Sequence, residues 1–151
     1  MQTRMRNPAQ VLPDALPSLL AVGKASDNCG VPALTLKLTH LRASQINGCG
    51  FCVDMHAKEL KKLGASDERI FAVSAWHEAP YFGPEERAAL ALTDAMTRLN
   101  DRNDAVPDSV WQEASKYYDE RALSALIMSI ALVNLWNRLN VTTKQVAGAW
   151  R

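Results

Sequence analysis

The sequence has little net charge, few cysteines and no uncharged hydrophobic run of membrane-spanning length. Seventeen basic side chains against sixteen acidic ones leave a formal charge of +1, so no strong field would attract nucleic acid or anionic lipid. The basic residues Arg4 and Arg6 are not followed by an apolar stretch long enough for a signal peptide. We therefore expect a cytoplasmic protein that binds neither nucleic acid nor a membrane.

The chain also lacks the cysteine content of a disulfide-stapled fold. Three cysteines in a reducing compartment do not make a structural framework, and a closely spaced pair is more often catalytic, redox-active or metal-binding. A hydrophobic fraction of 48% excludes intrinsic disorder, and no repeat or low-complexity tract is present. With 151 residues, the chain has the length of one domain, spanning 1–151, that buries its own core.

No segment shows the alternating pattern of a β-strand, and nearly all segments carry helical periodicity, so the predicted fold class is all-α. The last predicted helix is apolar around almost its whole circumference between Ala122 and Val133, which predicts a place at the centre of the bundle or between subunits. The ranges expected to be helical are 16–25, 32–45, 49–63, 66–75, 83–100, 107–118 and 120–140, with a loop at 77–82.

Three chemically reactive side chains share one face of the helix expected at 49–63. At about 100° per residue, Cys49, Cys52 and His56 fall within a sector of roughly 60° on the apolar side, so they should face inward. Cys49 begins the helix, where unpaired N–H groups favour a thiolate, and Cys52 has His56 four residues further on. Such a pair can close a disulfide with little rearrangement, as a reversible two-electron cycle requires.

Other interpretations of this triplet are weaker. Buried cysteines often act as small hydrophobes, and a buried histidine is often a satisfied core residue. Zinc would find three ligands here, but a structural site needs four, and the sequence has no second CxxC and no HxxxH. Haem attachment is excluded because Val53, not a histidine, follows Cys52. We therefore expect a redox pair without a metal or cofactor.

The segment from Leu41 to His56, LRASQINGCGFCVDMH, resembles the signature of the alkylhydroperoxidase D-like (AhpD-like) proteins of the carboxymuconolactone decarboxylase superfamily. A looser similarity continues at 72–76, 85–92 and 135–139. The resemblance implies an AhpD-like helical bundle with a central two-helix CxxC motif. It also implies a homo-oligomer, commonly a hexamer built as a trimer of dimers, with a dimer or trimer as alternatives, and thiol-dependent reduction of alkyl hydroperoxides.

The resemblance also assigns roles to the three side chains. It makes Cys52 the cysteine that attacks the peroxide, Cys49 the more exposed resolving cysteine and His56 the residue that handles the proton. Analogy with thioredoxin-type motifs would instead make Cys49 the first nucleophile, so the order stays open. Attack would give a sulfenic acid that the second cysteine captures as a disulfide. An external dithiol, such as a lipoyl or thioredoxin-like protein, must then restore the thiols.

Two positions depart from the family pattern. Lys37 stands where the family has the glutamate of its proton relay, and Phe51 stands where a tyrosine is common. Lys37 falls on the apolar stripe of its helix, a costly place for a charge, so we hypothesise that it faces the thiols and stabilises a thiolate. The alternative is that its long stem reaches solvent.

Glu59 could replace the missing carboxylate, because it lies one turn beyond His56; a solvent ion pair with Lys58 or Lys62 is the alternative. We expect the remaining polar candidates to lie outside the chemistry. We expect His40 to be peripheral and Cys29 to be a buried bystander. His77 and Glu78 should belong to a surface loop or to the mouth of the site. Asn134 and Asn137 should determine packing or subunit register.

These observations favour an antioxidant enzyme, either a peroxidase or the disulfide-reducing adaptor of one. A non-catalytic oligomer that kept the fold is the alternative, which the departures at Lys37 and Phe51 support. A decarboxylase acting on a muconolactone-like lactone is a third possibility, but that reaction has no evident need for two neighbouring thiols.

Overall fold

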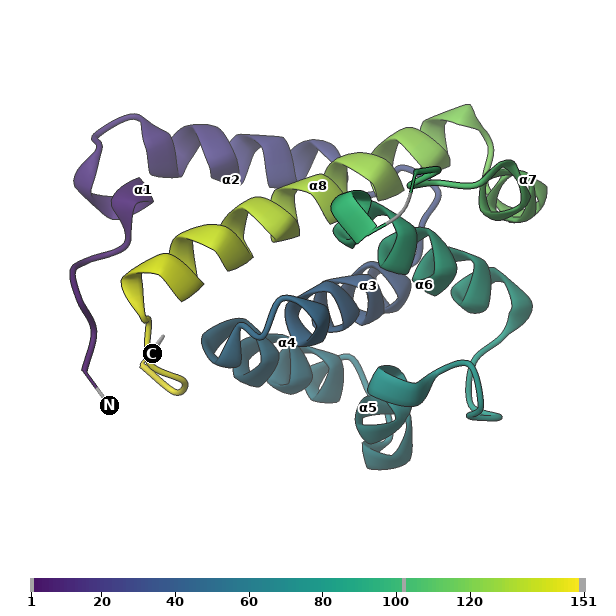
Figure 1. The fold of residues 1–151 in the computed structure, drawn as a ribbon, viewed down its shortest axis with the longest axis horizontal. Helices are drawn as coiled ribbons and strands as arrows, with labels where there is room; N and C mark the ends of the chain where they lie inside the picture. Colours follow the sequence, from purple (N-terminus) through teal and green to yellow (C-terminus); the bar gives the residue numbers. More distant parts are fainter. Residues whose placement is uncertain (1, 102, 150–151) are drawn as a thin grey trace.

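A computed structural model describes residues 2–101 and 103–149, and the described chain is all-helical, without a strand, as the sequence predicts. Two 3₁₀ turns, Val73–Ala75 and Leu99–Asp101, continue the helices that precede them. The helices are α1 (Pro8–Val11), α2 (Ala15–Ala25), α3 (Ala33–Ile46), α4 (Gly50–Lys62), α5 (Asp67–Ala72), α6 (Pro84–Thr97), α7 (Asp108–Tyr117) and α8 (Glu120–Thr143), as Figure 1 shows.

Local sequence accounts for most helix ends. Asp119 accepts a hydrogen bond from the N–H of Ala122 and so caps α8, and Ser66 caps α5 in the same way. Gly64 takes a left-handed φ of 85° just beyond α4, a conformation that glycine adopts without strain. The sequence analysis did not predict α1, because four residues are too few for a periodic pattern, and it ended α8 three residues early.

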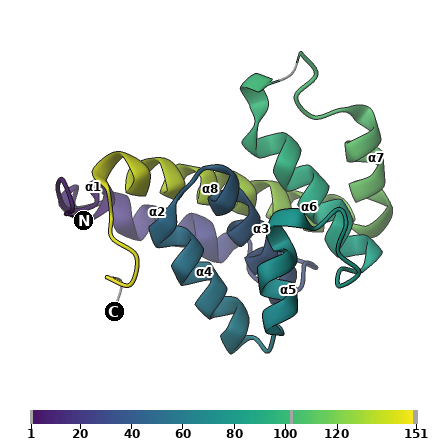
Figure 2. The same ribbon diagram turned by 60° about the horizontal axis from the view of Figure 1, so that its bottom comes forward.

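α3 and α4 form a helical hairpin whose turn is Asn47–Gly48, and α3 lies at the centre of the bundle, packed on α4, α6 and α8 (Figure 2). Arg42 fixes α3 against α6: its guanidinium bonds the Asp94 carboxylate, with Nη2 2.9 Å from Oδ2. One apolar cluster, which includes Leu38, Leu60 and Val73, fills the space between the hairpin and the segment that follows it.

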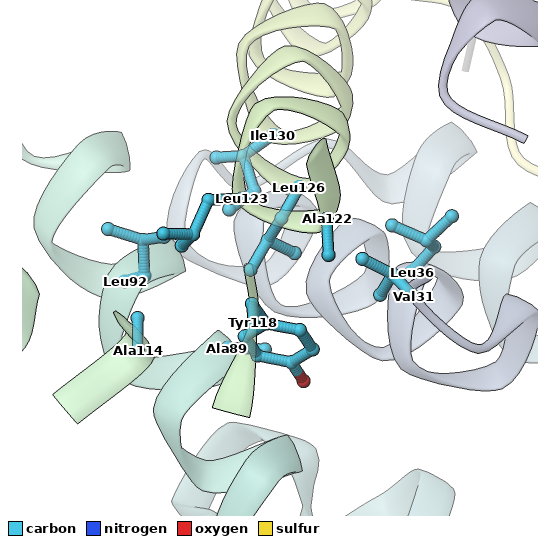
Figure 3. Close-up of a cluster of buried hydrophobic side chains, with 10 residues drawn as sticks. All are labelled: Val31, Leu36, Ala89, Leu92, Ala114, Tyr118, Ala122, Leu123, Leu126 and Ile130. Atoms are coloured by element: carbon cyan, nitrogen blue, oxygen red, sulfur yellow. The ribbon is translucent and has the colours of Figure 1, made fainter. Parts of the chain in front are cut away.

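The first half of α8 forms the second apolar cluster with α6 and α7 (Figure 3). Leu126 and Ile130 are completely buried, and they face side chains such as Ala89 and Leu92 of α6. Burial of this apolar surface is the main stabilising contribution, at about 25 cal/mol for each Å² removed from water. One face of this predicted helix is thus buried in the bundle, while Met128 on the opposite face is 48% exposed, so the alternative of a place between subunits stays a prediction.

α8 is also long and apolar enough to meet the length and composition criteria for a membrane span. Half of its most apolar window is buried inside the bundle, and its polar residues Asn134 and Asn137 make hydrogen bonds there to side chains of the α3–α4 hairpin. One face of α8 therefore makes the contacts of a core helix in a helical bundle.

The two ends of the described chain lie side by side (Figure 1). The backbone N–H of Arg4 donates to the carbonyl of Thr143 at 2.9 Å, and Gln145 Nε2 donates to the carbonyl of Met5 at 2.9 Å. Gly148 then donates its N–H to Asp54 Oδ2 on α4 at 3.1 Å. The segments before α1 and after α8 are therefore held together beside α4.

Candidate redox site

The two cysteines of the CxxC segment lie at the start of α4 and are joined by a disulfide, with their Cα atoms 5.3 Å apart. Cys49 is the N-cap residue, with an extended backbone, and its sulfur accepts the N–H of Cys52 at 3.3 Å. A sulfur in this position meets backbone N–H groups that have no partner inside the helix. The local geometry that the spacing predicts is therefore present.

Both cysteines are buried in the single chain, Cys49 with 2% and Cys52 with 1% of its surface exposed. The two values differ too little to make either cysteine the more exposed one, and both sulfurs are closed off from solvent. The cause is the hairpin turn, which Asn47 holds against α8 by donating to Asn134 Oδ1 and Asn137 Oδ1, each at 2.9 Å.

Cys52 faces a cavity of about 770 Å³ between α2, α3, α4 and α8, whereas Cys49 is not among the residues that line it. Most of the wall is apolar, with leucines from α2 opposite Phe51 and Met55 of α4 and Trp136 of α8. The polar part of the wall includes Lys37 and His40 of α3, His56 and Glu59 of α4, and Asn140 of α8. The cavity thus offers an apolar ligand a route to one sulfur of the pair.

His56 and Glu59 form a hydrogen-bonded pair on α4, with His56 Nδ1 2.8 Å from Glu59 Oε2. Lys37 Nζ reaches the same carboxylate oxygen from α3 at 3.0 Å. Burial raises the pKa of Glu59, but the His56 hydrogen bond and the Lys37 charge outweigh it and lower that pKa to about 2. The carboxylate is therefore ionised throughout the neutral range.

The structure gives partners to both of these charges. Lys37 pairs with Glu59 and does not bond a sulfur, although it lines the cavity together with Cys52. The partner of Lys58 is Asp54, at 2.8 Å, so Glu59 turns inward to His56 and not outward to Lys58. Glu59 thus occupies the position of a carboxylate that orients the imidazole and fixes its tautomer.

His40 is part of the site, so its predicted peripheral position is wrong. Its Nε2 lies 2.6 Å from Ser129 Oγ of α8, and its ring centroid is 5.0 Å from that of His56. Burial, followed by the charges of His56 and Lys37, places the pKa of His40 well below its usual value; burial also lowers the pKa of His56. Both imidazoles are therefore neutral near pH 7.

Asn140 is a residue of the site that the sequence analysis missed. Its Nδ2 donates to Cys52 Sγ at 3.3 Å from the last turns of α8. The available signal was the spacing, because Asn134, Asn137 and Asn140 recur every three residues on one face of an apolar helix. Asn134 and Asn137 do act in packing within the chain, through Asn47 of the hairpin turn.

The remaining candidates lie elsewhere. Cys29 is partly exposed, not buried as expected, and its thiol contacts the carbonyl of Ala25. His77 and Glu78 are exposed and do not line the cavity, which favours the surface-loop interpretation. Within residues 2–101 and 103–149, no group of histidine, cysteine and acidic side chains is arranged to hold a metal ion.

The fold and site together define an all-helical protein with a thiol pair beside an apolar cavity, and comparison with protein families gives this class a name. The model of the carboxymuconolactone decarboxylase family matches residues 13–95. The chain belongs to this family, as the resemblance of its CxxC segment predicts.

Two relatives and two solved structures describe its neighbourhood. The uncharacterized protein YdfG of Bacillus subtilis (strain 168) is 32% identical over 132 residues, which are 87% of this chain and 88% of YdfG. The alkyl hydroperoxide reductase AhpD of Hyphomonas neptunium is 47% identical over 45 residues, but these are 30% of this chain and only 25% of that enzyme.

The crystal structure of ATU0492 from Agrobacterium tumefaciens superposes with a TM-score of 0.89 at 32% identity, covering 98% of this chain and 99% of that one. ATU0492 is described as a protein of unknown function and a candidate antioxidant defence protein AhpD. The debrominase Bmp8 shares the fold, with a TM-score of 0.80 at 20% identity over 91% of this chain and 73% of its own.

Proposed function

We propose that the chain is a thiol-dependent peroxidase that reduces organic hydroperoxides through the Cys49–Cys52 pair. The observation that carries the proposal is a disulfide between two cysteines that are separated by two residues at a helix start, with one sulfur facing a large, mostly apolar cavity. The family membership supports it, because AhpD proteins carry a short stretch of high identity to this chain. We propose Cys52 as the attacking sulfur, since Cys49 does not line the cavity.

The proposed catalytic cycle has three steps. The Cys52 thiolate attacks the terminal peroxide oxygen, the O–O bond breaks, and the products are a Cys52 sulfenic acid and an alkoxide that takes a proton to become the alcohol. The Cys49 thiol attacks the sulfenic sulfur, forming the disulfide and releasing water. An external dithiol then reduces the disulfide and is itself oxidised to a disulfide.

We assign proton handling in this cycle to His56. Its lowered pKa keeps the imidazole neutral, so it is able to accept the Cys52 thiol proton and return it to the leaving alkoxide. Glu59 holds the ring by its Nδ1, and Lys37 keeps Glu59 ionised. In this proposal Lys37 and Glu59 together replace the family glutamate whose position Lys37 occupies.

The burial of both sulfurs bears on the electron donor. A reductant has to enter the cavity to reach Cys52, which favours a dithiol on a long flexible arm, such as a lipoyl group, over a thiol fixed at the surface of a thioredoxin-like protein. We also propose a cytoplasmic homo-oligomer, with a hexamer favoured over a dimer or trimer. The apolar side chains Leu20, Met128 and Leu135 are exposed on α2 and α8 and would be covered in such an assembly.

The test is peroxide consumption with dihydrolipoamide as reductant, using cumene hydroperoxide and hydrogen peroxide as substrates. We expect Cys52→Ser to abolish turnover, and Cys49→Ser to consume about one equivalent of peroxide and stop. Cys29→Ser is the matched control, because this third cysteine lies outside the cavity, and it should keep the parent rate. Equal rates in all variants would remove the peroxidase proposal and leave the non-catalytic oligomer.

A further inference from the structure

The sulfur that faces the cavity receives a hydrogen bond from a residue 88 positions further along the chain. Asn140 Nδ2 of α8 lies 3.3 Å from Cys52 Sγ, and Asn140 is buried, with 6% of its surface exposed. A neutral disulfide sulfur is a weak acceptor, so this contact contributes little in the oxidised protein. A thiolate at the same position would be a charged acceptor, for which a buried N–H donor has a much larger effect.

The orientation of the Asn140 amide follows from a backbone N–H group, which can only donate a hydrogen bond. The N–H of Ala9 donates to Asn7 Oδ1 at 2.9 Å, so the other end of the Asn7 amide is its donor. That donor, Asn7 Nδ2, bonds Asn140 Oδ1 at 2.7 Å, which turns Asn140 Nδ2 toward the sulfur. A flipped amide at either residue would place two donors or two acceptors against each other.

The charged groups near Cys52 do not by themselves account for stabilisation of its thiolate, so the Asn140 donor has a role. The ammonium of Lys37 is bound by Glu59, and burial keeps His56 neutral, so neither places a free positive charge against Cys52. Cys52 is the third residue of α4, and the N-cap position, where the sulfur meets unpaired N–H groups, is occupied by Cys49. An additional donor from α8 supplies part of the stabilisation that these groups do not provide.

We infer that Asn140 stabilises the thiolate of Cys52 in the reduced protein, and that Asn7 is the positioning residue that aims its amide. Reduction by a dithiol breaks the S–S bond, oxidises the dithiol to a disulfide and leaves Cys49 as a thiol, Cys52 as a thiolate and one released proton. The inference shares with the proposed function only the choice of Cys52 as the working sulfur.

The experiment measures the thiolate itself and needs no peroxide. In a Cys29→Ser, Cys49→Ser background Cys52 is the remaining thiol, and its ionisation is followed by the ultraviolet absorbance of the thiolate during a pH titration. We expect Asn140→Leu to raise the pKa of Cys52, lowering the thiolate-to-thiol ratio about tenfold at a fixed pH below the transition. The matched control is Asn134→Leu, a change to an asparagine of the same helix with the same 6% exposure but no bond to the sulfur.

Asn7→Ser provides an independent second variant. Serine keeps a capping oxygen for α1 but lacks the amide donor that orients Asn140, so we expect a smaller rise in the pKa of Cys52 with helix content unchanged. This variant decides the question if Asn140→Leu does not fold. An unchanged or lowered pKa of Cys52 in the folded variants, or an equal rise in Asn134→Leu, would overturn the inference.

A redox titration gives a second readout. With both cysteines present and Cys29→Ser as background, Asn140→Leu should shift the equilibrium with glutathione toward the disulfide by up to about tenfold, or about 30 mV. The shift is expected because loss of the donor destabilises the reduced form alone. If these shifts are observed but the protein consumes no peroxide, the inference about the thiolate holds and the peroxidase proposal is wrong.

Discussion

The two halves of α8 differ in chemistry although they form one continuous helix. Up to Val133 the buried face carries leucine, isoleucine and alanine side chains that pack on α6 and α7. Beyond it the buried face carries Asn134, Asn137 and Asn140, which bond the hairpin turn and Cys52. The first half stabilises the fold mainly by burying apolar side chains and contacts the site through Ser129, which bonds His40. The second half holds several polar atoms of the hairpin turn and of Cys52 in place.

The largest loss of stability is expected from a substitution in the apolar half of α8. Leu126→Ala removes a completely buried side chain from the cluster with α6 and α7, and the free energy of unfolding should fall by about 2–5 kcal/mol. Denaturant unfolding of the reduced protein measures it. The Cys52 pKa should stay at its parent value, and a shifted value would contradict the division of α8 into two roles.

A smaller loss of stability is expected from the polar half. Asn137→Ala removes the acceptor of Asn47 Nδ2 and the donor to Ser44 Oγ, which lies 3.0 Å away, so buried polar groups lose partners at a cost of about 1–3 kcal/mol. Here the disulfide should also change, because the turn before Cys49 loses one of its two bonds to α8. We expect a fixed concentration of dithiol to reduce the disulfide of this variant faster than that of the parent. An unchanged rate of reduction would contradict the idea that the bonds between the turn and α8 protect the disulfide.

The buried imidazoles predict that the free energy of unfolding depends on pH. The folded pKa values of His40 and His56 lie below the unfolded value of 6.5, so the unfolded chain binds more protons and stability falls as the pH drops below about 6.5. Lys37, His56 and Glu59 are the charged or titratable groups around His40, and Glu59 stays ionised down to about pH 2. The change in unfolding free energy between about pH 5 and pH 7.5 therefore reports the protonation of the two histidines.

His40→Gln tests this window, because glutamine does not titrate and keeps a polar group toward Ser129. The difference in unfolding free energy between the two pH values should shrink relative to the parent. His77→Gln is the control, since its side chain is 67% exposed and should leave the difference unchanged. An identical effect of both substitutions would show that burial is not the cause.

The smallest effect is expected at Lys37. Lys37→Met removes a charge that lines the cavity but does not bond the sulfur, so the thiolate-to-thiol ratio of Cys52 should fall by about threefold, less than for Asn140→Leu. The thiolate titration described above measures it, with Lys58→Met as a matched change on the outer side of α4, where Lys58 pairs with Asp54. No change in Lys37→Met would remove the hypothesis that Lys37 stabilises the thiolate.

The sequence predicts the parts of this molecule that depend on one helix at a time. The boundaries of α2, α3 and α4 lie within about one residue of expectation, because proline, glycine and aspartate mark them. The alignment of Cys49, Cys52 and His56 follows from the helical repeat alone. The contact of Cys52 with Asn140 depends on how α8 crosses α4, and no local pattern contains that crossing.

The same distinction explains the error at His40 and the ion-pair partner of Lys37 that the sequence did not predict. Both lie on α3, and their surroundings are set by the rotation of α3 against α4 and α8, which brings Glu59 to Lys37 and Ser129 to His40. Periodicity correctly indicated that Lys37 is turned toward the interior. It could not indicate that an acidic side chain of the next helix meets it there.

The pairing of the chain ends links peripheral residues to the reactive sulfur. Asn7 lies just after the segment that bonds Thr143, and it holds the amide that contacts Cys52. If Asn140 sets the pKa of Cys52 as proposed, an affinity tag or fusion partner joined close to either end should shift that pKa as well as change the solubility of the protein. Kinetic constants should be compared only between preparations whose terminal extensions are identical.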